Sequence, residues 1–387
     1  MNFLILGDGA EELAWARAIA AHPRHSLLAA FPGFDEFPDV PEPSDLDDAL
    51  AVIGVEAAVV GGGLDFRAEA LRRVAAVGLA AVCLHPPGLD SEPYYMVALS
   101  REETGAVIVP DLAARLHPGV VALRQALGRG ELGAFRTLRH ESPVGPEGVS
   151  LARQAFPRVV DLVRAIVGEV EAVTATGAPP GPDPTEELVV HLRGPQSRRA
   201  EVRLRSGPPG PSRLIAQGAT GSLTLEYDPS FRLPARLIGT SADGTETANT
   251  LQPWDSHAAL LDVLVAAVAG RPASPTLLDG TRATELAEAA VRSLRRGRTV
   301  EMHYEEISEA GTFKSVMTSF GCVLLLGILG VLPAALIGPA LGMPWTIYLA
   351  YLIPPVLVAF VVLQSLRLGI RKVEEQPDEP SESVAES

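Results

Sequence analysis

The sequence has 387 residues, of which 20% are charged, and its formal net charge is −15. A strongly acidic chain repels the phosphate backbone of a nucleic acid, so these numbers argue against a nucleic-acid partner. The only lysines are Lys314 and Lys372. Residues 1–313 therefore offer no lysine as a general acid, a general base or a Schiff-base amine.

Cysteine and histidine usage predicts neither disulfides nor a metal site. The two cysteines, Cys83 and Cys322, lie in apolar stretches and are expected to be small buried hydrophobic residues. The histidines show no metal-ligand spacing. No basic region followed by an apolar core opens the chain, so we expect no signal peptide and a soluble part that folds in the cytoplasm.

The chain opens with a pattern typical of a dinucleotide-binding domain. Residues 3–6 predict a strand, Gly7-Asp8-Gly9 a turn, and residues 10–20 a helix. In such domains the glycines let the backbone approach a pyrophosphate at the helix N-terminus. Gly7, Gly9 and Ala10 are therefore the candidate cofactor-binding residues, although Glu12 stands where the third glycine is usual. The alternative is a tight turn without a ligand.

Residues 1–115 predict an α/β Rossmann domain, because apolar strands alternate with helices and so form a parallel, doubly wound sheet. Ser44 is the expected N-cap of a short helix. The further strands are predicted at residues 26–31, 55–60, 79–84 and 106–109, and the further long helices at 66–77 and 93–104.

Residues 116–305 predict an α+β domain with a mainly antiparallel open sheet, because consecutive strands are framed by helices. The strands are expected at residues 135–140, 170–176, 187–192, 200–204, 213–217, 221–227 and 235–239, and the helices near 116–127, 151–167, 254–269 and 280–296.

The C-terminal part predicts a membrane anchor. No Asp, Glu, Lys or Arg occurs at 315–366, and residues 316–341 and 345–366 are each long enough to span a bilayer. Basic residues flank the pair, which places both termini and the soluble domains on the cytoplasmic side of the cytoplasmic membrane. Residues 373–387 are expected to be a disordered acidic tail. The alternative is a buried helical hairpin.

Four segments in order resemble the Gfo/Idh/MocA family of NAD(P)-dependent oxidoreductases over residues 1–302. They are the opening strand with Gly7-x-Gly9, residues 107–127 with His117-Pro118, the strand at 221–225, and residues 269–300. The resemblance implies a Rossmann domain followed by an α+β domain with an open sheet. It also implies NAD or NADP as cofactor, a sugar or polyol as ligand, and a homo-oligomer.

The resemblance also assigns candidate catalytic residues. His85-Pro86-Pro87 matches the family's Glu-Lys-Pro, so His85 would replace the lysine as proton donor. Residues 61–67 match the family's P-n-x-x-H loop, so Arg67 stands where a histidine is usual. Gln154, Arg158 and Asp161 match its D-x-x-x-H-x-x-D helix, and Asp161 would orient a substrate hydroxyl. The alternatives are a loop histidine and an aspartate paired with neighbouring arginines.

Besides a membrane-assembly subunit whose partner is another membrane protein, two functions remain open. The first is a membrane-anchored NAD(P)-dependent oxidoreductase acting on a sugar or polyol with altered active-site residues. The second is a catalytically inactive family member that serves as a membrane-tethered binding or scaffold protein. Binding of NADH or NADPH separates the two.

Overall fold

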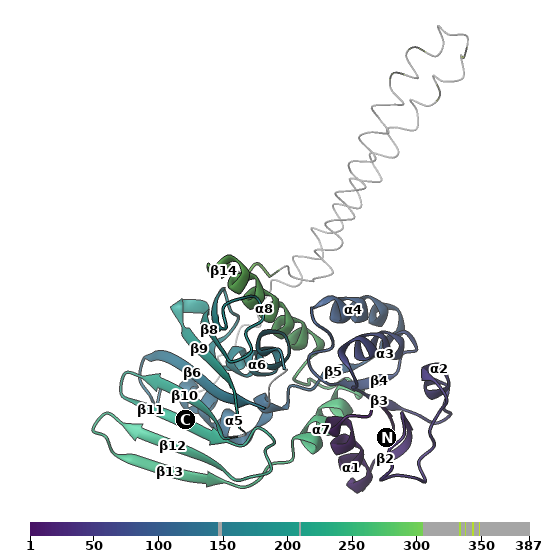
Figure 1. Ribbon diagram of the computed structural model, residues 1–387, viewed down its shortest axis with the longest axis horizontal. Coiled ribbons are helices and arrows are strands. Elements are labelled where there is room, and N and C mark those ends of the chain that lie inside the picture. Colours follow the sequence, from purple (N-terminus) through teal and green to yellow (C-terminus); the bar gives the residue numbers. More distant parts are fainter. Residues whose placement is uncertain are drawn as a thin grey trace, which may run out of the picture. The chain divides into compact units, whose positions relative to one another are not determined.

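The computed structural model describes residues 1–145, 149–208 and 210–304, and the single positions 333, 337, 343 and 348 (Figure 1). Residues 1–303 form one compact unit. Apart from those single positions, the predicted spans at 316–341 and 345–366 and the tail at 373–387 lie outside the described residues. Within the described part of the chain, no helix has the length and apolar character needed to cross a bilayer.

The first sheet confirms the predicted Rossmann architecture. Its strands follow the order β2-β1-β3-β4-β5 and all neighbours are parallel. Strands β1, β3, β4 and β5 are almost fully buried, as expected for a sheet covered on both faces, whereas the edge strand β2 buries only Ala29 and Ala30. Their bounds are β1 Asn2–Leu6, β2 Ser26–Phe31, β3 Ala57–Val60, β4 Ala80–Cys83 and β5 Ile108–Pro110.

Helices cover both faces of this sheet. On one face, α1 buries Trp15 and Ile19 against Phe3 and Ile5. Helices α3 and α4 pack on the other face. The short α2 corrects one prediction, because its N-cap is Asp45 rather than Ser44: the Asp45 carboxylate accepts from the Asp48 amide at 2.8 Å. The bounds are α1 Ala10–Ala21, α2 Leu46–Leu50, α3 Leu64–Ala76 and α4 Glu92–Thr104.

The second sheet is mixed and mainly antiparallel, as predicted. Its order is β13-β12-β11-β10-β6-β9-β8-β7-β14, and β6 and β9 are its parallel pair. The sequence pattern missed β13, an exposed edge strand without an apolar face, and the short β14. The bounds are β6 Phe135–Val144, β7 Ala172–Ala178, β8 Glu187–Arg193, β9 Arg199–Ser206, β10 Ser212–Gly218, β11 Gly221–Tyr227, β12 Ala235–Ser241, β13 Glu246–Leu251 and β14 Val300–Glu301.

Helices cover one face of the second sheet and join it to the first. Helix α8 lies between the two sheets, whereas α7 packs beside α1 on the first sheet although it follows the second sheet in the sequence (Figure 1). The apolar side chains of α7 join those of α1 and β1 in one buried cluster, and this packing holds α7 against the first sheet. The bounds are η1 Ala113–Leu116, α5 Pro118–Gly128, η2 Leu151–Ala155, α6 Phe156–Val167, η3 Pro195–Ser197, α7 Ser256–Val268 and α8 Leu277–Arg296.

Two buried histidines belong to the core under the second sheet. His117 caps α5, where its Nδ1 accepts from the Gly119 amide at 3.1 Å, and its ring stacks on Tyr227. His140 on β6 shares a hydrogen bond of 2.9 Å between its Nε2 and the Tyr227 hydroxyl. Burial lowers the pKa of each imidazole to about 4. Both rings are therefore neutral core groups at neutral pH.

We expect His140 to contribute to acid sensitivity. Its pKa falls from 6.5 to about 4 on folding, so its contribution to stability is complete above pH 6.5 and is lost as the pH falls toward 4. Between pH 6.5 and 4, the slope of the free energy of unfolding against pH should be smaller in His140→Gln by about 1.4 kcal/mol per pH unit, as measured by urea unfolding. Tyr227→Phe is the control, because it keeps the histidine. An unchanged slope in His140→Gln would contradict the prediction.

Candidate functional site

A cleft of about 400 Å³ opens where the carboxyl ends of the first sheet's strands meet the second domain. In open parallel sheets, ligands bind outside this edge. Its volume suits a small ligand. The residues that line it are Glu11, Gly62, Gly63, Leu64, Arg67, Pro86, Val144, Val149, Gln154, Ala155 and Arg158.

The glycine turn lies directly against the loop that follows β3. Gly7 has a φ of +120°, and a Cβ atom there would collide with the backbone of Gly61 and Gly62. Only glycine combines that backbone conformation with so close an approach. Helix α1 then begins after Gly9, and no side chain caps it. The predicted cofactor residues Gly7, Gly9 and Ala10 thus form an uncapped helix N-terminus at the strand edge.

Glu12 fills the space between the two glycine loops. Its side chain is only 3% exposed, and its Oε1 accepts from the Gly62 amide at 2.5 Å. A Cβ atom on Gly9 or on Gly61 would collide with its carboxylate. The negative charge of Glu12 is therefore enclosed between backbone segments that have no side chains of their own.

Arg67 ties together the two loops on the first-domain side of the cleft. From α3, its buried guanidinium donates to the carbonyl oxygens of Gly62 at 2.8 Å, Pro86 at 2.7 Å and Leu84 at 3.3 Å. Charged donors make stronger hydrogen bonds than neutral ones. Arg67 therefore fixes the loop after β3 and the loop after β4 relative to each other.

An ion pair crosses the cleft from one domain to the other. Arg158 on α6 donates to Glu11 on α1, with N–O distances of 2.5 and 3.0 Å. Burial opposes ionisation of Glu11, but the hydrogen bond and the charge of Arg158 leave its pKa below the ordinary value. Gln154 lies in the same wall, and its Oε1 accepts from the Ser150 amide, which leaves its NH₂ group to donate. The cleft therefore offers both donors and an acceptor to a polyhydroxylated ligand.

The residues at the glycine turn do not fit a dinucleotide as they stand. The tight turn and the uncapped helix suit a pyrophosphate. The Glu12 carboxylate does not, because it already occupies the space beside Gly9 and would repel a phosphate there. Glu36, an acidic residue a few positions beyond β2, is paired with Arg17 at 2.8 Å.

His85 lies beneath the cleft rather than in its wall. Its ring is 2% exposed, stacks on Tyr94 and shares a hydrogen bond of 3.0 Å between its Nδ1 and the Tyr94 hydroxyl. Burial, followed by the charges of Arg158 and Arg67, lowers its pKa to about 3. His85 is therefore neutral at pH 7, and its neighbour Pro86 is the one that reaches the cleft. Its role as proton donor stays a prediction.

Asp161 belongs to a buried ion cluster with Arg115, Arg164 and Asp279. Arg115 donates to Asp161 Oδ1 at 3.0 Å, its Nε lies 2.9 Å from Oδ2 as an ion pair, and Arg164 approaches at 3.4 Å. Burial raises the pKa of Asp161 to about 6, although both arginines oppose this. Asp161 does not line the cleft, so the structure does not bring it together with His85 and the glycine turn there. Its role toward a substrate stays a prediction.

Two further polar residues lie near the glycine turn that the sequence analysis did not select. Asp111, directly after β5, accepts from the Trp15 indole at 3.3 Å, and His257 packs edge-on against the same indole. Burial raises the pKa of Asp111 and lowers that of His257. The position of Asp111 at the end of a strand was the signal that could have identified it.

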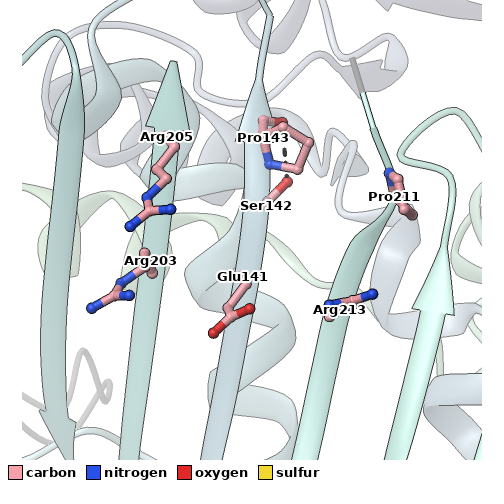
Figure 2. Close-up of a pocket in the computed structure, with 7 residues that line it drawn as sticks. All are labelled: Glu141, Ser142, Pro143, Arg203, Arg205, Pro211 and Arg213. Carbon is pink, nitrogen blue, oxygen red and sulfur yellow. Dashed lines mark hydrogen bonds between the residues drawn. The ribbon is translucent and has the colours of Figure 1, made fainter. Parts of the chain in front are cut away.

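Another hollow lies on the face of the second sheet that carries its charged side chains. Figure 2 shows Arg203 and Arg205 on β9 beside Glu141 on β6, with Arg213 on the next strand. These charges are matched across strands, because Arg205 pairs with Glu187 at 2.7 Å and Arg213 with Glu226 at 2.9 Å. This face is therefore an array of ion pairs. The homo-oligomer stays a prediction.

Among the described residues, no group of three histidine, cysteine, aspartate or glutamate side chains lies close enough together to hold a metal ion.

Comparison with known proteins relates the chain to sugar and polyol oxidoreductases, although no family model matches it. It is 24% identical over 336 residues to an inositol 2-dehydrogenase from Rhizobium meliloti (strain 1021), covering 78% of this chain and 99% of the relative. The crystal structure of an aldose-aldose oxidoreductase from Caulobacter crescentus, complexed with glycerol, matches with a TM-score of 0.67 at 19% identity, covering 78% and 99% of the two chains.

A third match carries a cofactor. The crystal structure of an oxidoreductase from Agrobacterium radiobacter, in complex with NAD+, L-tartaric acid and magnesium, gives a TM-score of 0.65 at 16% identity, covering 78% of this chain and 98% of the other. At these identities the likeness shows the fold. The described chain thus has the fold that its resemblance to the Gfo/Idh/MocA family implied: a Rossmann domain followed by a domain with a large mixed sheet.

Proposed function

We propose that the protein is an NAD(P)-linked oxidoreductase that acts on a sugar or polyol. The observation that carries the proposal is the cleft at the carboxyl edge of the Rossmann sheet, walled on its other side by η2 and α6. The relatives of the same fold include an inositol dehydrogenase and an aldose oxidoreductase, which supports this substrate class.

The cleft residues have the chemistry to hold a polyol. Arg158 and Gln154 present N–H donors, and Glu11 presents an acceptor, at the edge where the glycine turn lies. Ring and chain hydroxyls pair with such a mixture in a partly enclosed site. NAD or NADP would supply the hydride acceptor, and residues 1–313 contain no lysine to assist proton transfer.

Cofactor titration tests the proposal. Full-length protein, purified in mild detergent, is expected to bind NADH or NADPH saturably below about 1 mM, and to reduce NAD(P)+ with one member of a panel of inositols, aldoses and alditols. Gln154→Ala should raise KM for that substrate about tenfold with a smaller change in kcat, because it removes a ground-state hydrogen bond. Absence of both binding and turnover would reject the proposal.

A second candidate is a ligand-binding protein without redox chemistry. Two observations favour it: Glu12 occupies the space at the glycine turn, and His85 is buried and neutral. In this case a sugar or polyol would bind in the cleft with no dependence on NAD(P)H. Calorimetric binding of a polyol without cofactor, combined with no turnover, would select this candidate.

We further propose attachment to the cytoplasmic membrane through residues 316–366, with the described domains on the cytoplasmic side. The support is the absence of Asp, Glu, Lys and Arg from 315 to 366, with basic residues on both flanks. The full-length chain should stay in the pellet after alkaline carbonate washing, whereas a chain ending at residue 304 should be released. Release of both would reject the anchor.

A further inference from the structure

The space filled by the Glu12 carboxylate is built by glycines from two separate loops. Gly9 belongs to the turn before α1, and Gly61 and Gly62 to the loop after β3. Side chains at Gly9 or Gly61 would clash with the carboxylate, so the space exists only because these positions have none. The carboxylate takes a hydrogen bond of 2.5 Å from the Gly62 backbone amide.

This environment is one that stabilises an anion. Glu12 lies in the first turn of α1, where the amide dipoles favour negative charge, and no other side chain caps that helix. Arg158 lines the same cleft and pairs with Glu11, the residue beside Glu12 in the chain, so a cation lies near this turn. Backbone amides, a helix N-terminus and an arginine are the groups that bind phosphate in other proteins.

We propose that the Glu12 carboxylate occupies the space between Gly9, Gly61 and Gly62 where a phosphate of the cofactor would bind, here called the phosphate cradle. It thereby sets the affinity of this protein for NAD(H) or NADP(H). The inference rests on the proposed function, because it concerns the same cleft. A pyrophosphate can enter only when the Glu12 side chain leaves the space between Gly9 and Gly61. The carboxylate and a phosphate would compete for the Gly62 amide and for the space beside Gly9, and they repel each other at short range.

The test compares matched variants of the full-length protein by calorimetric titration with NADH and NADPH. Glu12→Ala empties the cradle and should lower the Kd at least about tenfold relative to wild type. Asp8→Ala removes one negative charge from the same turn but from an exposed side chain, and it should change the Kd by less than about threefold because solvent screens that charge.

Glu12→Gln is a second variant that separates the loss of charge from any loss of stability in Glu12→Ala. Glu12→Ala leaves the Gly62 amide without its acceptor, whereas glutamine keeps an acceptor and removes only the charge. Glu12→Gln should therefore melt close to wild type and bind NAD(P)H at least about threefold more tightly.

The outcomes separate the inference from the proposed function. Tighter binding by the Glu12 variants supports the inference, and if wild type then shows neither binding nor turnover, the proposed function is rejected. Equal, measurable binding by wild type and both Glu12 variants overturns the inference and leaves the proposed function standing. No binding and no turnover by wild type or any variant overturns both.

Discussion

Replacing Asp161 with alanine is expected to lower the free energy of unfolding by about 3–5 kcal/mol, because it removes one of the carboxylates that neutralise two buried guanidinium groups. Arg115 and Arg164 are 8% and 7% exposed, and Asp161 and Asp279 are the carboxylates that lie between them. Without Asp161, the two guanidinium groups would share Asp279, and Arg164 would keep Glu169 as a second partner. The cluster also joins η1, α6 and α8, so its loss should loosen the contact between the two domains.

Urea unfolding of Asp161→Ala measures this cost. The control is Glu36→Ala, which breaks the exposed pair with Arg17, where the side chains are 45% and 52% exposed, and should change stability by less than about 1 kcal/mol. Asp161→Asn keeps the volume and should fall between the two. If Asp161→Ala melts like wild type but abolishes turnover, Asp161 acts on the substrate rather than in a structural cluster.

Elements with strong periodicity could be predicted from the sequence. Strands β1 to β5 are short apolar runs bounded by glycine or proline, and alternating apolar residues mark β8 and β9. Strand β13 could not be found in this way, because its side chains are exposed and its hydrogen bonds to β12 define it. The N-cap of α2 was misplaced by one residue because Ser44 and Asp45 are both good caps, and only backbone geometry chooses between them.

The candidate site was predicted only in part. The glycine turn is local in sequence and lies where expected. The partners that decide its chemistry are distant along the chain: Gly62 for Glu12, Arg158 for Glu11, and Arg115 for Asp161. Sequence spacing alone does not show such tertiary contacts. For the same reason, Arg67 was recognised only as a substitute for a histidine, and its role in joining two loops emerged from the structure.

Replacing Arg67 with methionine should lower the free energy of unfolding by about 2–4 kcal/mol, because three carbonyl groups lose a charged donor while the apolar length of the side chain is kept. Lysine should not rescue the protein, because one ammonium group cannot reproduce the planar guanidinium that reaches Gly62, Leu84 and Pro86 together. Ligand binding in the cleft should weaken with either variant, since Gly62 and Pro86 form part of its wall.

Arg72→Met is the matched control for this prediction, because Arg72 lies on the same helix and pairs with Glu69 at the surface, where the two side chains are 45% and 43% exposed. It should change stability by less than about 1 kcal/mol. Thermal and urea unfolding of the three variants measure the difference. Equal stability of Arg67→Met and Arg72→Met would show that the loops hold their positions without the guanidinium. The cleft wall would then depend on the Glu12 contact to Gly62 instead, and Glu12→Ala should show the larger loss of stability.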